Sequence, residues 1–225
     1  MTALPSFDPR HAPVVGVDAQ LPKVAASALQ PQAIAQRFDR NHTWTPELHA
    51  EPRFSSKALV HASVLIPLVL RDTGLTVLLT QRTAHLSSHS GQVAFPGGKA
   101  DPEDADATDT ALREAEEEIG LDRHLVDILG RMPVYTTGSA FIVTPVVGLV
   151  QATLRLTPNP HEVADVFEVP LAFLMDPANH RRHAMQWEGG RREWLSIPFM
   201  DGPVERFIWG ATAGMLRNFY RFLLD

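Results

Sequence analysis

Four glutamates stand close together in the chain, at positions 114, 116, 117 and 118. In an α-helix, which turns about 100° per residue, Glu114, Glu117 and Glu118 lie within one sector of about 100° and Glu116 points away from it. Three carboxylates on one face repel one another, so they need either solvent or a bound cation. Oxygen ligands suit Mg²⁺, with Mn²⁺ as a substitute, better than zinc, which prefers nitrogen and sulfur. The face is therefore a candidate site for a hard divalent cation, with a solvated acidic surface as the alternative.

A magnesium ion held by carboxylates usually completes its coordination shell with water and with phosphate oxygens of a substrate. The expected substrate therefore carries a phosphate or a diphosphate, and the expected reaction is cleavage of a phosphorus–oxygen bond. The ion would neutralise charge on the diphosphate and lower the pKa of the attacking water. A carboxylate that does not bind the ion would accept the proton from that water.

The sequence around the glutamates indicates how this face is held in place. An apolar stripe on the same predicted helix faces a core and consists of Ala111, Leu112, Ala115 and Ile119. Gly120 suits the end of the helix, and residues 104–108 offer side chains that can cap its start. A Phe-Pro-Gly-Gly turn at residues 95–98 precedes the helix. We therefore expect a rigid helix that aims its carboxylates to one side.

The composition excludes several classes of protein. The 225 residues are 44% hydrophobic and 20% charged, which suits one catalytic domain with a substantial core. A net charge of −6 disfavours a role in coating nucleic acid or binding an anionic membrane. No cysteine is present, which excludes disulfides and thiolate sites and favours a cytoplasmic location. No apolar run approaches the ~20 residues of a membrane span, and residues 1–22 do not resemble a signal peptide.

The order of the remaining patterns is mixed α and β. Residues 1–55 contain several prolines and a helical patch at 31–39, and we expect them to form an N-terminal arm packed on one domain of residues 56–225. Strands are expected at 62–70, 75–81, 92–95, 126–132, 141–150 and 163–169, a helical turn at 171–175, a hairpin within 185–198 and an amphipathic helix at 210–224. The simplest architecture is α/β, with a small mixed β-sheet between the acidic helix and the terminal helix.

The segment GGKADPEDADATDTALREAEEEIGL, residues 97–121, resembles the Nudix box, whose pattern is Gly, five residues, Glu, seven residues, then Arg-Glu-apolar-x-Glu-Glu-x-Gly-apolar. The second half matches at every defined position, with Ala115 as the apolar residue. In the first half, Arg113 lies fifteen residues after Gly98 instead of fourteen, and Asp104 or Ala105 replaces the first Glu. Glu103 or Asp104 is therefore the candidate partner of Arg113.

A second stretch narrows the resemblance. LLTQRTAHLSSHSGQVAFPGG, residues 78–98, is similar to the signature that precedes the box in the coenzyme A pyrophosphatase branch of Nudix hydrolases, which shares the lengthened box. Residues 139–148, 162–177 and 208–216 are similar to the same branch. The resemblance implies the family's α/β/α sandwich and hydrolysis of the diphosphate of coenzyme A or its thioesters. The products would be 4′-phosphopantetheine, or its acylated form, and adenosine 3′,5′-bisphosphate.

The resemblance also implies roles for individual residues. Glu114 and Glu118 would bind Mg²⁺, Glu117 would be a third ligand or the base, and Gly98 would bring a backbone carbonyl near the metal. Arg113 belongs to the catalytic set through its place in the box, and Glu162 is a candidate base from outside the box, with an ordinary surface glutamate as the alternative.

Four more residues are candidates for binding the small-molecule substrate. Arg82 would pair with the 3′-phosphate or the diphosphate, although a surface salt bridge is an equally good interpretation. His89, like His85, would line the pocket or merely order its loop. Lys99 would contact phosphate or be solvated, and Phe141 would pack on the substrate or in the core.

Two other functions compete with coenzyme A hydrolysis. One is hydrolysis of another nucleoside diphosphate derivative, such as ADP-ribose or NADH, although no Ser-Gln-Pro-Trp-Pro-Phe run follows the box. The other is a non-catalytic module that senses a nucleotide. The presence of Glu114, Glu117 and Glu118 together argues against a pure sensor, because binding alone has no evident need for three mutually repelling carboxylates.

Overall fold

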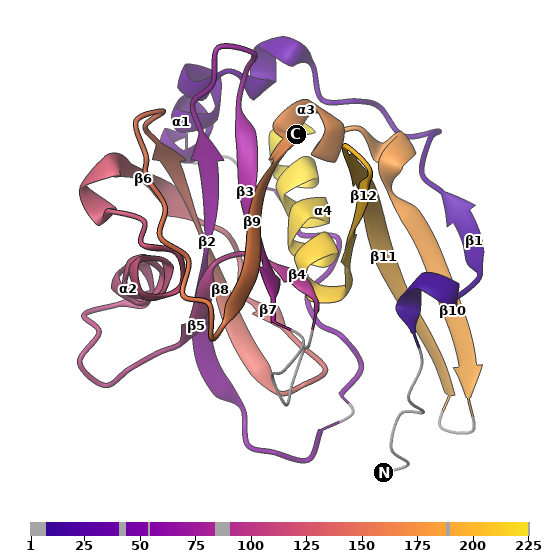
Figure 1. Ribbon diagram of the computed structural model, residues 1–225. Coiled ribbons are helices and arrows are strands. Elements are labelled where there is room, and N and C mark those ends of the chain that lie inside the picture. The colour runs from indigo at the N-terminus through magenta and orange to yellow at the C-terminus, as the bar shows by residue number, and fades with distance from the viewer. Residues whose placement is uncertain (1–7, 41–43, 54, 84–90, 188–189, 225) are drawn as a thin grey trace.

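Two β-sheets and four α-helices make up the computed structural model, which describes residues 8–40, 44–53, 55–83, 91–187 and 190–224 (Figure 1). The larger sheet contains β2 (Val60–Val69), β3 (Thr76–Arg82), β4 (Val93–Ala94), β5 (Gly97–Lys99), β6 (Val126–Arg131), β7 (Tyr135–Thr136), β8 (Phe141–Val150) and β9 (Val163–Pro170). The smaller sheet contains β1 (Val14–Val17), β10 (Arg181–Trp187), β11 (Gly190–Asp201) and β12 (Val204–Trp209). The helices are α1 (Pro31–Asp39), α2 (Ala107–Ile119), α3 (Leu171–Leu174) and α4 (Gly210–Leu224).

The larger sheet is mixed, as predicted. Its main path runs β4-β3-β2-β8-β6, while β5 pairs with β2, β7 with β8 and β9 with β3. The β2–β8 pair is parallel along its full length and the other pairs are antiparallel. Strand β2 is apolar on both faces: Leu65 and Val69 pack with α2, whereas Ile66 and Leu68 belong to the core on the other side. A central strand covered on both faces has this composition.

Helices cover both faces of the mixed sheet. Helix α2 packs on one face through the predicted stripe, in which Ala111, Ala115 and Ile119 are fully or almost fully buried. Helix α4 lies on the other face, between the two sheets (Figure 1). The predicted α/β/α sandwich is confirmed, although its mixed sheet has eight strands and is larger than we expected.

The smaller sheet was not predicted as a separate layer. Its strands pair antiparallel in the order β1-β10-β11-β12, so a strand from near the start of the chain joins a hairpin that lies more than 160 residues later. The periodicity of a strand indicates which face is buried but not its partner, so sequence patterns did not reveal this sheet.

The segment before residue 56 packs closely on the rest of the protein. Its predicted helix is α1, and Ile34 of that helix is fully buried in the main core. The division of the chain at residue 55 stays a prediction. In the described ranges, no helix is both long enough and apolar enough to cross a membrane.

Candidate active site

The ends of α2 are set by local sequence. The Asp106 carboxylate caps the first turn by accepting hydrogen bonds from the backbone N–H groups of Thr108 (2.7 Å) and Asp109 (3.0 Å). Gly120 ends the helix in the left-handed conformation, with φ of 67°, which a residue without Cβ adopts at little cost. Both predicted signals are confirmed, and the helix presents its glutamates at a defined rotation.

The two glycines of the preceding turn allow β5 to lie close to its neighbours. At Gly97, where φ is +153°, an added Cβ would lie 2.6 Å from the Cα of Val64. At Gly98, an added Cβ would lie 2.5 Å from Cδ and 2.7 Å from Oε1 of Glu114. The absence of side chains therefore brings this backbone directly against the first glutamate of the acidic face.

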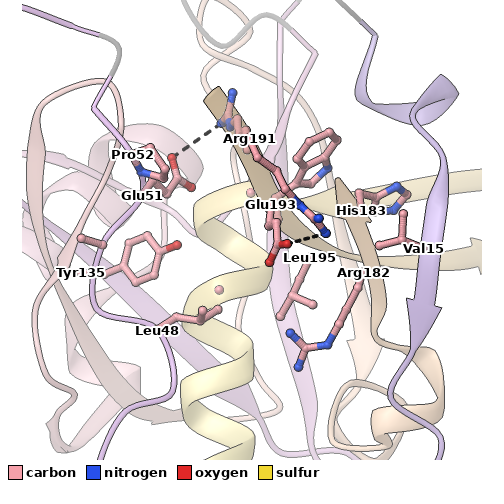
Figure 2. A pocket seen from close by; sticks show the side chains of 15 residues that line it. Val15, Leu48, Glu51, Pro52, Tyr135, Arg182, His183, Arg191, Glu193 and Leu195 are labelled. Atoms are coloured by element: carbon pink, nitrogen blue, oxygen red, sulfur yellow. Dashed lines mark ion pairs between the residues drawn. The ribbon is translucent and has the colours of Figure 1, made fainter. Parts of the chain in front are cut away.

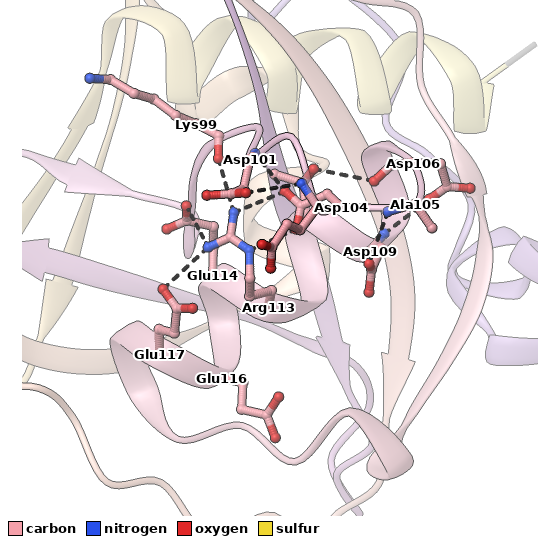
Figure 3. Close-up of polar contacts among 12 residues, drawn as sticks. Lys99, Asp101, Asp104, Ala105, Asp106, Asp109, Arg113, Glu114, Glu116 and Glu117 are labelled. Atoms are coloured by element: carbon pink, nitrogen blue, oxygen red, sulfur yellow. Dashed lines mark hydrogen bonds and ion pairs between the residues drawn. The ribbon is translucent and has the colours of Figure 1, made fainter.

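Arg113 organises the acidic face (Figure 3). Its Nε and Nη2 donate to the two carboxylate oxygens of Asp104 at 2.7 and 3.0 Å. Of the two candidate partners in the sequence, Glu103 and Asp104, Asp104 is therefore the one that binds Arg113. These hydrogen bonds hold the pKa of Asp104 well below its usual range. Nη1 of Arg113 also donates to Glu114 (3.1 Å) and Glu117 (3.2 Å), and Nη2 to the carbonyl of Lys99 (3.0 Å).

The three predicted ligands differ in their surroundings. The side chain of Glu118 is only 5% exposed, whereas that of Glu117 is 60% exposed and that of Glu114 is mostly buried. Glu118 accepts hydrogen bonds from the backbone N–H of Gly97 (3.0 Å) and from Arg82 (3.3 Å). Glu116 points away, as predicted, and pairs with Arg123 (3.2 Å).

Burial and mutual repulsion disfavour the charged forms of the two inner glutamates. Burial raises the pKa of Glu118 to about 7, against the opposing effects of Gly97 and Arg82, and the nearby Glu114 and Glu162 raise it further. Burial also raises the pKa of Glu114, with smaller contributions from Glu117 and Glu162. A cation at this face would relieve both effects.

Glu162 approaches the same face from the loop before β9. Its influence on the pKa values of Glu114 and Glu118 places its charge near theirs. The loop is attached to α2, since the N–H of Asn159 donates to the backbone carbonyl of Glu118 (2.9 Å), and the Asn159 amide donates to the Glu162 carboxylate (3.3 Å).

A cavity of about 490 Å³ adjoins the acidic face. Four predicted residues, Arg82, Gly98, Lys99 and Phe141, line it. It is also lined by Glu51, by Arg192 of β11 and by the first turn of α4, none of which we singled out as site residues, because nothing in their local sequence indicates that they meet. His85 and His89 lie outside the described residues.

The residues at the acidic face fit a divalent cation by chemical type. The side chains of Glu114, Glu117, Glu118 and Glu162 offer only oxygen donors, which Mg²⁺ and Mn²⁺ prefer. Among the described residues, no three His, Asp or Glu side chains are already arranged as a metal site. Arg113 instead draws Glu114 and Glu117 to itself, so metal binding requires these carboxylates to turn.

Comparison with known proteins identifies the family. The sequence model of the NUDIX domain matches residues 59–187. The chain is 43% identical over 162 residues to an uncharacterised Nudix hydrolase, NudL, of Yersinia enterocolitica, covering 70% of this chain and 78% of that protein. It is also 43% identical over 158 residues to NudL of Yersinia pestis, covering 70% and 76%.

Solved structures show a looser similarity. An Ap4A hydrolase of C. elegans has a TM-score of 0.44 and 20% identity over 52% of this chain and 86% of that chain. The NUDIX domain of Shewanella oneidensis NrtR, solved with ADP ribose, has a TM-score of 0.38 and 22% identity over 52% and 75%. On the family match and the relatives at 43% identity, the chain belongs to the NUDIX family and is a Nudix hydrolase, an enzyme of the class that uses divalent metal ions such as Mg²⁺ and acts on nucleoside diphosphate derivatives.

Proposed function

We propose that this protein hydrolyses the diphosphate of coenzyme A or of its thioesters, releasing 4′-phosphopantetheine or its acylated form and adenosine 3′,5′-bisphosphate. The observation that carries the proposal is which segments of the chain line the 490 Å³ cavity. Three distant stretches that resemble the coenzyme A branch, 78–98, 139–148 and 208–216, all contribute lining residues, including Arg82, Phe141 and Trp209. Segments that share a resemblance and also share one cavity support a common substrate.

In this proposal, Glu114 and Glu118 hold Mg²⁺, with Glu117 and the Gly98 carbonyl as further oxygen donors. The bound ion would supply charge neutralisation on the diphosphate and a lower pKa for the attacking water. Arg113, which Asp104 fixes, holds Glu114 and Glu117 beside the site through hydrogen bonds at 3.1 and 3.2 Å, and the two carboxylates would turn from it to bind the ion. Arg82, which contacts Glu118, would bind a phosphate at the same face.

Glu162 is the stronger of the two candidates for the general base. Glu117 is mostly exposed, and one of its carboxylate oxygens is already bound by Arg113 at 3.2 Å. Glu162 is half-buried, lies near Glu114 and Glu118, and accepts a hydrogen bond only from the neutral Asn159 amide among the contacts described. It would take one proton from water as the phosphorus–oxygen bond of the diphosphate breaks. Glu162→Gln should then lower kcat by about 10² to 10⁴-fold, and Glu117→Gln by much less.

A panel of substrates tests the proposal directly. The full chain with Mg²⁺ would be incubated with coenzyme A, acetyl-coenzyme A, ADP-ribose, NADH and a nucleoside triphosphate, and the products separated by chromatography. Adenosine 3′,5′-bisphosphate should appear fastest, from the coenzyme A substrates. Faster turnover of ADP-ribose or NADH would refute the substrate assignment, and no turnover of any compound would indicate a sensing module. We also propose a cytoplasmic location, on the basis of the composition.

A further inference from the structure

A second cavity, of about 220 Å³, adjoins the 490 Å³ cavity beside the acidic face (Figure 2). Glu51, Arg192 and Gly210 line both cavities, so the two share a border. Arg82 and Gly98, which adjoin the acidic face, line only the larger one. A substrate whose diphosphate lies at the acidic face would therefore enter the smaller cavity with a part that is remote from the cleaved bond.

The apolar walls of the smaller cavity come from two segments of the chain. Val15 and Leu48 belong to the segment before residue 56, and Trp194 and Leu195 belong to β11 of the smaller sheet. Trp194 and Leu195 are almost completely buried. All four residues lie outside residues 59–187, the range that matches the NUDIX domain. The cavity is therefore built by parts of this chain that surround the domain, and its carbon surface suits an apolar group.

The charged side chains that line the smaller cavity already interact with other groups of the protein. Within the part of the chain that the structure describes, the partners are Asp18 (2.7 Å) and Glu47 (2.9 Å) for Arg182, Ser196 (2.8 Å) for His183, the N–H of Gly138 (3.1 Å) for Glu51, Glu51 (3.8 Å) and the Trp194 ring for Arg192, and each other (2.7 Å) for Arg191 and Glu193. A charged ligand group would have to compete with these contacts. An uncharged apolar group would displace only water, which favours it as the occupant.

We propose that the smaller cavity binds the acyl group of a coenzyme A thioester, and that the enzyme thereby prefers acyl thioesters of limited length to free coenzyme A. The inference rests on the proposed function, in which the phosphates lie at one end of the substrate and the uncharged arm ends in the thioester. A water molecule occupies about 30 Å³ and a methylene group is of similar size, so 220 Å³ holds on the order of seven such groups. A hexanoyl group fits within this volume, whereas a dodecanoyl group exceeds it.

The test measures kcat/KM of the full chain with Mg²⁺ for coenzyme A and for its acetyl, hexanoyl and dodecanoyl thioesters. A fully buried methylene group contributes about fourfold to binding, and hexanoyl has four more of them than acetyl. The value for hexanoyl-coenzyme A should therefore exceed that for acetyl-coenzyme A and for coenzyme A by at least about tenfold, and should fall again for dodecanoyl-coenzyme A. Equal values for all four compounds would overturn the inference and leave the proposed function standing.

Two variants that change the size of the cavity test its role directly. Ala50→Leu adds carbon atoms at an exposed lining residue, and should lower the ratio of kcat/KM for hexanoyl-coenzyme A over coenzyme A by about tenfold. Leu48→Ala enlarges the cavity and should shift the preferred acyl chain to a greater length. Ala172→Leu makes the same change as the first variant at an exposed residue of α3 that lines neither cavity, and should keep the wild-type ratio.

The ratio of two substrates does not depend on the fraction of enzyme that is folded, so a partial folding defect cannot imitate these results. An Ala50→Leu enzyme that loses equal activity on both compounds, or a Leu48→Ala enzyme with the wild-type length preference, would overturn the inference. A wild type that cleaves ADP-ribose but none of the coenzyme A compounds would overturn the proposed function itself.

Discussion

Replacement of Gly98 by alanine should disable the active site without unfolding the protein. The new Cβ would lie 2.5 Å from the carboxylate carbon of Glu114, whereas ordinary contact begins at 3.4 Å. The Glu114 carboxylate must therefore retreat by about 1 Å. A misplacement of this size in a catalytic group costs about 100-fold in rate, or about 2.7 kcal/mol of transition-state stabilisation. Because the displaced atoms are the end of a flexible side chain, the free energy of unfolding should change by less than about 1 kcal/mol.

The assay measures kcat and its dependence on Mg²⁺ concentration, with the best substrate of the panel, together with thermal unfolding. Gly16→Ala is the matched control, since an added Cβ there meets nothing within 4 Å, and it should behave as the wild type. Gly97→Ala is the contrasting variant: its Cβ would meet the backbone of Val64 in a conformation unfavourable for side chains, so it should be strongly destabilised. A Gly98→Ala enzyme with near-normal kcat and unchanged Mg²⁺ dependence would refute the placement of Glu114 beside the metal.

Glu118→Gln should lower kcat at least 100-fold at saturating Mg²⁺, because a neutral amide is a poor substitute for a carboxylate ligand; near-normal kinetics would contradict the role. In metal-free protein, burial raises the pKa of Glu118 from 4.5 to about 7. The protonated carboxyl group therefore contributes fully to the free energy of unfolding below about pH 4.5. This contribution, about 3 kcal/mol, is lost as the pH rises through 7. Denaturation in a chelator at pH 5 and pH 8 should show this loss in the wild type and not in Glu118→Gln. Asp104→Asn should destabilise the protein by about 1 to 3 kcal/mol at pH 7. Because Arg113 lowers the pKa of Asp104, this difference should begin to decrease as the pH falls below about 4 and should be lost only well below that pH, which equilibrium denaturation from neutral to acidic pH checks.

Features that depend on neighbouring residues were accessible from the sequence. A cap within residues 104–108, the Gly120 terminus of α2 and the outward direction of Glu116 follow from helix periodicity and capping chemistry, and all agree with the structure, in which Asp106 is the cap. The choice of Asp104 over Glu103 as the partner of Arg113 could not be made, because the two are adjacent and only the path of the loop decides which carboxylate reaches the guanidinium.

The sequence by itself determined the family, the acidic helix and most of the strands, because the Nudix box and the apolar periodicities are local patterns. Only the tertiary structure decided the smaller sheet, the approach of Glu162 to the acidic face and the meeting of Glu51 with Arg192. It also decided that Glu118, alone among the four clustered glutamates, is almost completely buried. Burial and long-range pairing arise from packing between distant segments, which no local spacing of residue types records.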